Sequence, residues 1–162
     1  MMETRVGLGF DVHPFASGRP LVLGGVEVPA DRGLGGHSDA DALTHAVADA
    51  LLGALALGDL GRHFPDSDPR YRGISSQVLL GQVADRVRAA GGRVVNVDAT
   101  VIAESPRLAE WLDGMQTRLA ATLGLPAERV SVKAKRAEAL GALGRQEGIA
   151  AMAVALVERP HA

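Results

Sequence analysis

The sequence has no cysteine, little net charge and no long hydrophobic run. Without cysteine the protein forms no disulfide bond, has no thiolate nucleophile and can hold zinc only through His, Asp or Glu. A formal net charge of −2 and a pI of about 6.2 give no sign of binding to nucleic acid or to a membrane surface. No apolar run approaches the ~18 residues of a membrane span, and the first residues lack the apolar core of a signal peptide. These absences predict a cytoplasmic protein that contacts neither nucleic acid nor a membrane.

The remaining composition is that of an ordinary folded domain, with 162 residues of which 47% are hydrophobic and 22% are charged. A chain of this length buries roughly 70% of the surface that it exposes when unfolded. No internal repeat and no linker divides it. We therefore expect residues 1–162 to form a single domain.

A short motif near the N-terminus carries the first chemical signal. Residues 5–14 have the pattern of a β-strand, in which Asp11 and His13 alternate with Val12. Side chains two apart on a strand point to the same face, so the carboxylate and the imidazole emerge about 6–7 Å apart along the chain. Such a pair suits two ligands of a metal or an acid/base pair. Taken alone, it is more often the pattern of an exposed polar edge strand.

A second cluster of His and Asp follows a glycine-rich loop at residues 29–36. Ser38 is expected to cap a helix that runs to about residue 57, with Asp41 as a capping-box acid. His45 lies about 200° around this helix from Leu43, at 100° per residue, and therefore on the polar face one turn after Asp41. The two clusters together favour a functional site over two unrelated polar surfaces.

The rest of the chain alternates between further strands and helices. Strands are expected at residues 21–23, 26–28, 93–103, 130–135 and 149–157, and helices at 75–90, capped by Ser75 or Ser76, and at 108–123, with loops at 62–73 and 136–148. This order indicates an α+β fold, a two-layer sandwich of a mixed β-sheet with helices on one face. The last strand is apolar at every position, so both of its faces should be buried. Because helices cover only one face, we expect the sheets to pack together in a homo-oligomer.

Six motifs, in collinear order from residue 5 to about residue 158, resemble 2-C-methyl-D-erythritol 2,4-cyclodiphosphate synthase. They are G-L-G-F-D-V-H at 7–13, G-G-H-S-D-A-D at 35–41 with His45 beyond, A-L-G-D-L-G at 56–61, F-P-D-S-D-P at 64–69, N-V-D-A-T-V-I at 96–102 and G-R-Q-E-G-I-A at 144–150.

The resemblance implies a phosphorus–oxygen lyase of the non-mevalonate route to isoprenoid precursors. Its substrate would be 4-diphosphocytidyl-2-C-methyl-D-erythritol 2-phosphate, whose 2-phosphate attacks the β-phosphorus to form the 2,4-cyclodiphosphate and release CMP. The family is a homotrimer with an active site at each subunit boundary. It uses one zinc ion per subunit and a second cation, Mg²⁺ or Mn²⁺.

The resemblance also implies roles for individual residues. Asp11, His13 and His45 match the zinc ligands, with a fourth place left for a phosphate oxygen, and Glu138 matches the ligand of the second cation. Asp41 is the candidate to orient a ligand imidazole. The catalytic positions are His37, Arg136 and Asp59. The substrate-binding positions are Asp11, Val12, His13, His37, Ser38, Asp59, Leu60, Gly61, Phe64, Pro65, Asp66, Ser67, Asp68, Ala103, Glu104, Ser105, Pro106, Arg107, Leu108, Ala109, Lys135, Arg136, Ala137, Glu138, Ala142 and Arg145.

Within this set, residues 59–68 match the pocket for the methylerythritol phosphate, and residues 103–109 and 135–138 match the cytidine-diphosphate side. Arg145 and Glu147 match positions near the trimer axis, where the family has a cavity for a prenyl diphosphate. An ion pair between subunits is an equally good interpretation of these two residues. Arg136 departs from the family, in which many members carry threonine. Arg136 either binds the diphosphate through its guanidinium or turns outward at the rim of the site, and we favour the rim position.

Two other classes of protein fit the same residues. A zinc phosphohydrolase, or a hydrolase of the cyclic-nucleotide type, would use the same three ligands with an activated water. A trimeric nucleotide-binding sensor would hold a structural metal, with a closed set of four ligands.

Overall fold

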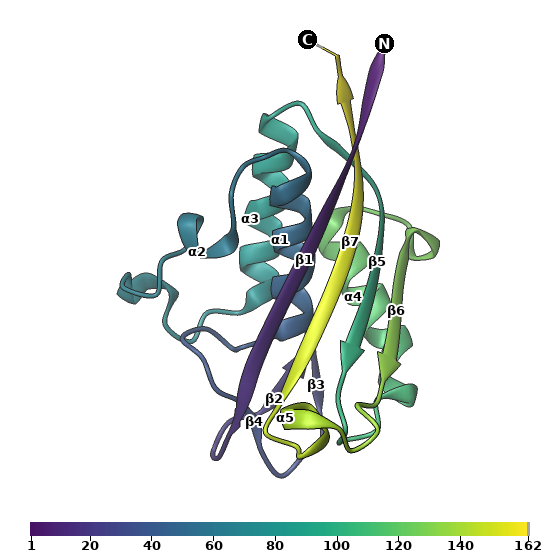
Figure 1. The fold of residues 1–162 in the computed structure, drawn as a ribbon. Helices are drawn as coiled ribbons and strands as arrows, with labels where there is room; N and C mark the ends of the chain where they lie inside the picture. The colour runs from purple at the N-terminus through teal and green to yellow at the C-terminus, as the bar shows by residue number, and fades with distance from the viewer. Residues whose placement is uncertain (162) are drawn as a thin grey trace.

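A five-stranded mixed sheet organises the computed structural model, which describes residues 1–161 (Figure 1). The strand order is β4-β1-β7-β5-β6, with β7 in the centre. Strand β7 is antiparallel to β1 and β5, and β5 and β6 are parallel. The strands are β1 Met2–Ala16, β4 Gly33–Leu34, β5 Arg93–Ile102, β6 Val130–Lys135 and β7 Gly148–Pro160, while β2 Leu21–Leu23 and β3 Val26–Val28 form a separate hairpin.

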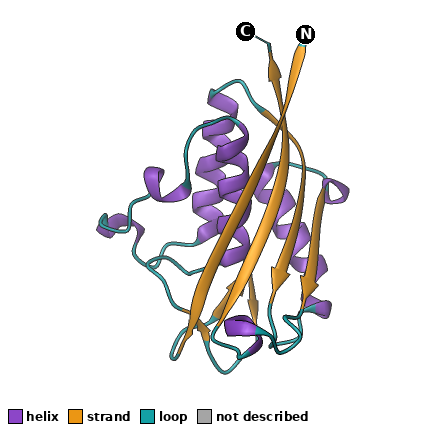
Figure 2. Ribbon diagram, viewed as in Figure 1, coloured by secondary structure: helices purple, strands orange, loops and turns teal. Residues whose placement is uncertain are grey.

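Three helices pack on one face of this sheet (Figures 1 and 2). They are α1 Ala42–Ala54, α3 Ser76–Ala89 and α4 Leu112–Leu123. The predicted α+β class, with a mixed sheet covered by helices on one side, is confirmed. Smaller elements lie between the long ones: α2 Leu60–His63, α5 Gly141–Gly144 and the 3₁₀ turns Pro69–Tyr71 and Ala127–Arg129. The first residues of the helix predicted at 108–123 form a further 3₁₀ turn, Ala109–Trp111, and the α-helix itself begins at Leu112. Among the described residues, no helix combines the length and the hydrophobicity that a membrane span requires.

Two glycines of the first motif allow α1 to lie directly on β1. A Cβ atom on Gly7 would stand 1.8 Å from the carbonyl oxygen of Ala50, and one on Gly9 would stand 1.8 Å from that of Ala46. Any side chain at either position would push the helix away from the strand. This close approach brings His45, the neighbour of Ala46, against the end of β1 that carries Asp11 and His13.

On β1 and β7, the other face of the sheet is apolar and exposed. The side chains of Val6, Leu8, Phe10 and Val12 on β1 point outward, as do Met152 and Val154 on β7, and each residue is between 41% and 64% exposed. Leu8 lies opposite Val154, and Phe10 opposite Met152, so they form one patch. Strand β7 is therefore buried on a single face within one chain, whereas its sequence predicts burial on both.

The start of α1 differs from the prediction. Its N-cap is Asp41, not Ser38. The fully buried Asp41 carboxylate accepts hydrogen bonds from the backbone N–H groups of Gly24, Gly25 and Thr44 and from the Thr44 hydroxyl, at 2.6–2.9 Å. These donors use its acceptor capacity and fix the β2–β3 turn on the helix. The hypothesis that Asp41 orients the imidazole of His45 is consequently wrong. Of the two alternatives for α3, the cap is Ser75.

Candidate functional site

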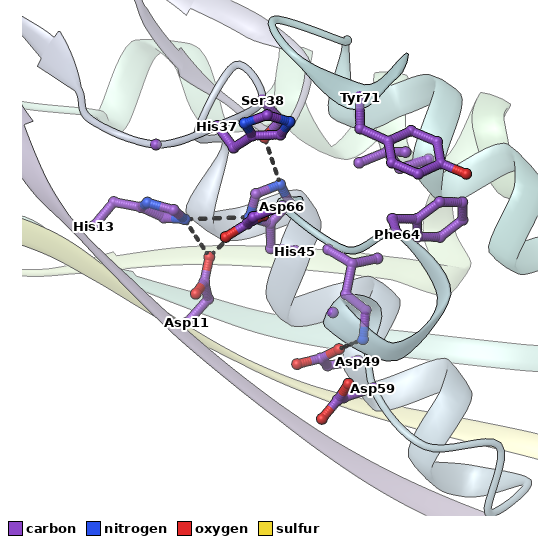
Figure 3. A pocket seen from close by; sticks show the side chains of 14 residues that line it. Asp11, His13, His37, Ser38, His45, Asp49, Asp59, Phe64, Asp66 and Tyr71 are labelled. Carbon is purple, nitrogen blue, oxygen red and sulfur yellow. Dashed lines mark hydrogen bonds and ion pairs between the residues drawn. The ribbon is translucent and has the colours of Figure 1, made fainter. Parts of the chain in front are cut away.

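Three side chains converge where β1 meets α1 (Figure 3). Asp11 Oδ2 lies 2.9 Å from His13 Nε2 and 3.0 Å from His45 Nδ1, and the two nitrogens are 3.3 Å apart. Asp11 and His13 share the inner face of β1, as their alternation predicts, while His45 projects from the first turn of α1. In the part of the chain that the structure describes, this is the only group of three His, Cys, Asp or Glu side chains so arranged.

The size of this triangle suits a transition-metal ion. Four ligands held at ~2.0–2.1 Å in a tetrahedron lie about 3.3 Å from one another, close to the observed separations. Two imidazole nitrogens and one carboxylate oxygen are a donor set typical of zinc, and three protein ligands leave one position open. The residues present therefore fit a metal ion.

Contacts on the far side of each imidazole fix how the rings are oriented. His13 Nδ1 donates to the carbonyl oxygen of Gly35 at 2.8 Å, which leaves Nε2 for a metal. His45 Nε2 lies 2.8 Å from Ser76 Oγ and 3.2 Å from Ser38 Oγ. His45 lies on the polar side of α1, as predicted, but this side is buried against Asp11, Ser38 and Ser76, because α1 is packed between the sheet and α3.

The electrostatics of the cluster favour charge on its carboxylate. Burial by itself would raise the pKa of Asp11, but hydrogen bonds from His13 and His45 outweigh it and lower that pKa to about 2. For His13, burial would lower the pKa, but the hydrogen bond to Asp11 prevails and raises it. The site thus stabilises the ionised carboxylate of Asp11 beside two imidazoles.

A cavity of about 360 Å³ opens from the cluster. Its walls include ten of the residues that the sequence assigns to the site: Asp11, His13, His37, Ser38, His45, Asp59, Leu60, Gly61, Phe64 and Asp66. His37 stands at the opposite side of the cavity from Asp11, with its Nε2 3.2 Å from the carbonyl oxygen of Asp68 (Figure 3).

Sequence reasoning missed two polar residues of this cavity, Asp49 and Tyr71. Asp49 Oδ1 accepts a hydrogen bond of 2.7 Å from the backbone of Leu60, and burial raises the pKa of this carboxyl group. That bond holds α2 and its N-cap, Asp59, against α1. One signal was present: Asp49 is an acid one turn after His45 in an otherwise apolar helix.

A second cavity, of about 410 Å³, lies at the far edge of the sheet beside β6. It collects most of the residues matched to the cytidine side, namely Ala103, Glu104, Pro106, Arg107, Leu108, Ala109, Lys135 and Arg136. Here Arg136 Nη2 donates to Glu104 Oε1 at 2.6 Å. The Glu104 side chain is only 6% exposed and also accepts a hydrogen bond from the backbone of Ala137.

The remaining predicted residues line neither cavity. Val12 faces outward from β1, and Ser105 borders a separate hollow with Phe15 and Arg32. Arg145 pairs with Glu147 at 3.2 Å within the chain, so this pair needs no second subunit. The others are Pro65, Ser67 and Asp68 in the loop before the first 3₁₀ turn, and Ala137, Glu138 and Ala142 after β6.

The two cavities are far apart in a single chain. The first is built on β1 and the second on β6, and the strands β7 and β5 separate them in the sheet. Three strand spacings correspond to about 14 Å. One chain by itself therefore does not bring the two sets of predicted residues into contact.

An open three-ligand His/Asp site on the wall of a cavity, carried by an α+β sheet, is the arrangement of a metal-dependent enzyme. Residues 4–158 match the YgbB family. A curated relative, the 2-C-methyl-D-erythritol 2,4-cyclodiphosphate synthase of Laribacter hongkongensis, is 60% identical over 157 residues, which cover 97% of each chain.

Solved structures also match this chain. The bifunctional IspDF of Campylobacter jejuni matches with a TM-score of 0.95 and 42% identity over 99% of this chain, which spans 43% of that longer protein. A 2C-methyl-D-erythritol-2,4-cyclodiphosphate synthase in its CDP-bound form matches with a TM-score of 0.87 and 37% identity, over 94% of this chain and 99% of that one. The chain belongs to the YgbB family. The resemblance predicted from the six motifs is thereby confirmed, and so is the prediction of an enzyme of this lyase class.

Proposed function

We propose that this chain converts 4-diphosphocytidyl-2-C-methyl-D-erythritol 2-phosphate to 2-C-methyl-D-erythritol 2,4-cyclodiphosphate and releases CMP. An oxygen of the 2-phosphate bonds to the β-phosphorus, the bond from that phosphorus to the CMP oxygen breaks, and CMP leaves with the electron pair. The observation that carries this proposal is the open Asp11/His13/His45 triangle on the cavity wall, in a chain of the YgbB family.

The chain's task in this reaction is to position a charged substrate. A phosphate monoester is largely dianionic at neutral pH, so the nucleophile needs no general base. Asp11, His13 and His45 would hold a zinc ion, which when bound supplies Lewis-acid stabilisation of the diphosphate charge. His37 and Ser38, in the loop before α1, would contact phosphate beside the metal site, and the exposed carboxylate of Asp59 would accept hydrogen bonds from the polyol hydroxyls.

The arrangement of the two cavities supports a site shared between subunits. The exposed apolar patch on β1 and β7 gives the sheets a surface to pack on, and trimer assembly would bring the β1 cavity of one subunit beside the β6 cavity of another. The cytidine diphosphate would then occupy the β6 side, near residues 103–109 and 135–138. Glu138, exposed in the turn after β6, would be the ligand of a Mg²⁺ or Mn²⁺ ion. The single domain and the cytoplasmic location stay predictions of the sequence.

Product analysis tests this function directly. Incubation with the diphosphocytidyl substrate, zinc and Mg²⁺, followed by phosphorus NMR, is expected to show CMP and a cyclic diphosphate in equal amounts. The matched control is the same reaction with the metals chelated, in which both signals should be absent. A linear phosphate product would instead identify a hydrolase, and substrate that stays intact with full zinc would indicate a binding protein.

Arg136 gives a separate prediction. Its ion pair with the nearly buried Glu104 holds the guanidinium at the rim of the β6 cavity, which supports the rim position over direct contact with the diphosphate. We expect Arg136→Thr to lower kcat by less than about tenfold, whereas the loss of a well-placed oxyanion donor costs about 10²–10³-fold. Steady-state kinetics should be compared with Arg129→Thr, a change at an exposed arginine outside both cavities. A loss of 10²-fold or more, with zinc content and assembly intact, would place Arg136 on the diphosphate.

A further inference from the structure

A fully buried serine links the candidate metal site to a carboxylate behind it. Ser76 is the first residue of α3, and its Oγ lies 2.8 Å from His45 Nε2. The same hydroxyl is hydrogen-bonded to Asp39 Oδ1, and the Ser76 backbone donates to Asp39 Oδ2 at 2.9 Å. His45, Ser76 and Asp39 are therefore joined by a continuous chain of hydrogen bonds. It begins at Nε2 of His45, the ring nitrogen that does not face Asp11.

The chemistry of the three groups sets which atom donates in each of these hydrogen bonds. An ionised carboxylate only accepts hydrogen bonds, so the single hydroxyl proton of Ser76 goes to Asp39. The lone pairs of Ser76 Oγ then face the imidazole, and His45 Nε2 must carry a proton in order to donate to them. The lone pair of the ring is left on Nδ1, the atom that lies 3.0 Å from Asp11 and 3.3 Å from His13 Nε2.

These hydrogen bonds oppose the other tautomer of His45, which carries its proton on Nδ1. Asp11 Oδ2 is itself an acceptor for a proton on Nδ1, and a proton there would occupy the lone pair that a metal needs. Asp39, acting through Ser76, favours the proton on Nε2 instead. Ser38 is a weaker alternative, since its Oγ is 3.2 Å from Nε2 and already accepts a hydrogen bond from the backbone of Ala40.

We propose that Ser76 and Asp39 are positioning residues that hold His45 in the tautomer whose Nδ1 is available to the metal. This inference rests on the proposed function, in which His45 is a zinc ligand. His13 receives the same support from the main chain, through the carbonyl oxygen of Gly35. The two imidazoles are thus oriented by different means, one by a backbone acceptor and the other by a serine and a carboxylate.

Zinc affinity, measured by competition with a chromophoric chelator, tests the proposal without reference to turnover. Ser76→Ala is expected to raise the Kd for zinc by about 10–100-fold, the usual cost of losing a group that orients a ligand. Ser76→Thr, which keeps the hydroxyl, should stay much closer to wild type. The control is Ser17→Ala, which removes an exposed hydroxyl in the turn after β1, outside both cavities, and should leave the Kd within about twofold. Circular dichroism and thermal unfolding establish that each variant is folded.

A double-mutant cycle tests whether Asp39 acts on His45 through Ser76 or whether the two residues have independent structural roles. Asp39→Asn should weaken zinc binding in the wild-type background but add little to Ser76→Ala, because Asp39 acts on His45 through that hydroxyl. In the zinc-loaded protein, proton NMR should show a His45 Nε2–H signal that is protected from exchange and is lost in Ser76→Ala.

Wild-type zinc affinity in Ser76→Ala, or additive losses in the cycle, would overturn the proposal while the zinc site itself stands. Should Ser76→Ala not fold, Asp39→Asn alone carries the test, and unchanged affinity and an unchanged Nε2–H signal would overturn it. A wild-type protein that binds no zinc would overturn the proposed function and this inference together.

Discussion

His45→Ala is expected to give a folded protein that holds much less than one zinc per chain and has almost no activity. Removing one of three protein ligands takes away both a donor and the geometry of the site. Lewis-acid assistance is worth several kcal/mol, and because each ~1.4 kcal/mol is a factor of ten, we expect kcat/KM to fall by about 10³-fold or more. Elemental analysis of the purified variant gives the zinc content.

The matched control is His63→Ala. His63 is hydrogen-bonded to the carbonyl oxygen of Leu57, lies outside the triangle and should retain full zinc when replaced. One zinc per chain in His45→Ala would rule out the assignment of the three ligands.

A charge on the outer face of β7 should prevent assembly without preventing folding. Val154 is 44% exposed in one chain and lies opposite Leu8 in the apolar patch, so a single chain tolerates Val154→Asp. Sheet-to-sheet packing would bury this aspartate unpaired, at a cost of about 3–5 kcal/mol for each subunit. We expect analytical ultracentrifugation to show a trimer for the wild type and a monomer for the variant. Activity should be lost with the trimer, because each proposed site needs two subunits.

Two further substitutions make this test specific. Val78→Asp places the same change on an exposed valine of α3, on the helical side of the sheet, and should leave both trimer and activity intact. Ala153→Asp, one residue from Val154, falls on the buried inner face and should abolish folding itself. A wild-type protein that sediments as a fully active monomer would remove the shared-site proposal.

Local pattern was sufficient for much of this molecule. Alternation along residues 5–14 placed Asp11 and His13 on one face, because the two-residue period of a strand does not depend on its neighbours. The spacing of apolar residues at three and four positions located all three long helices, with ends within a few residues of those observed. The uninterrupted apolar sequence of β7 predicts burial of both of its faces, and in a single chain its apolar outer face is exposed.

The partners of the polar residues could not be predicted in this way. Asp41 and His45 are one turn apart, yet Asp41 binds the β2–β3 turn while His45 faces β1 and α3, since α1 is enclosed on nearly every side. Asp39 and Ser76 are 37 positions apart in sequence, and only the packing of α3 on α1 makes them neighbours.

The sequence by itself determined the class of fold, the family and the three candidate metal ligands, because strand and helix periods and collinear motifs are local properties. Only the tertiary structure decided which groups orient those ligands. It also placed the two sets of substrate-binding residues at opposite edges of one sheet. Hydrogen-bond partners and strand order arise from contacts between distant segments, and no local pattern specifies them.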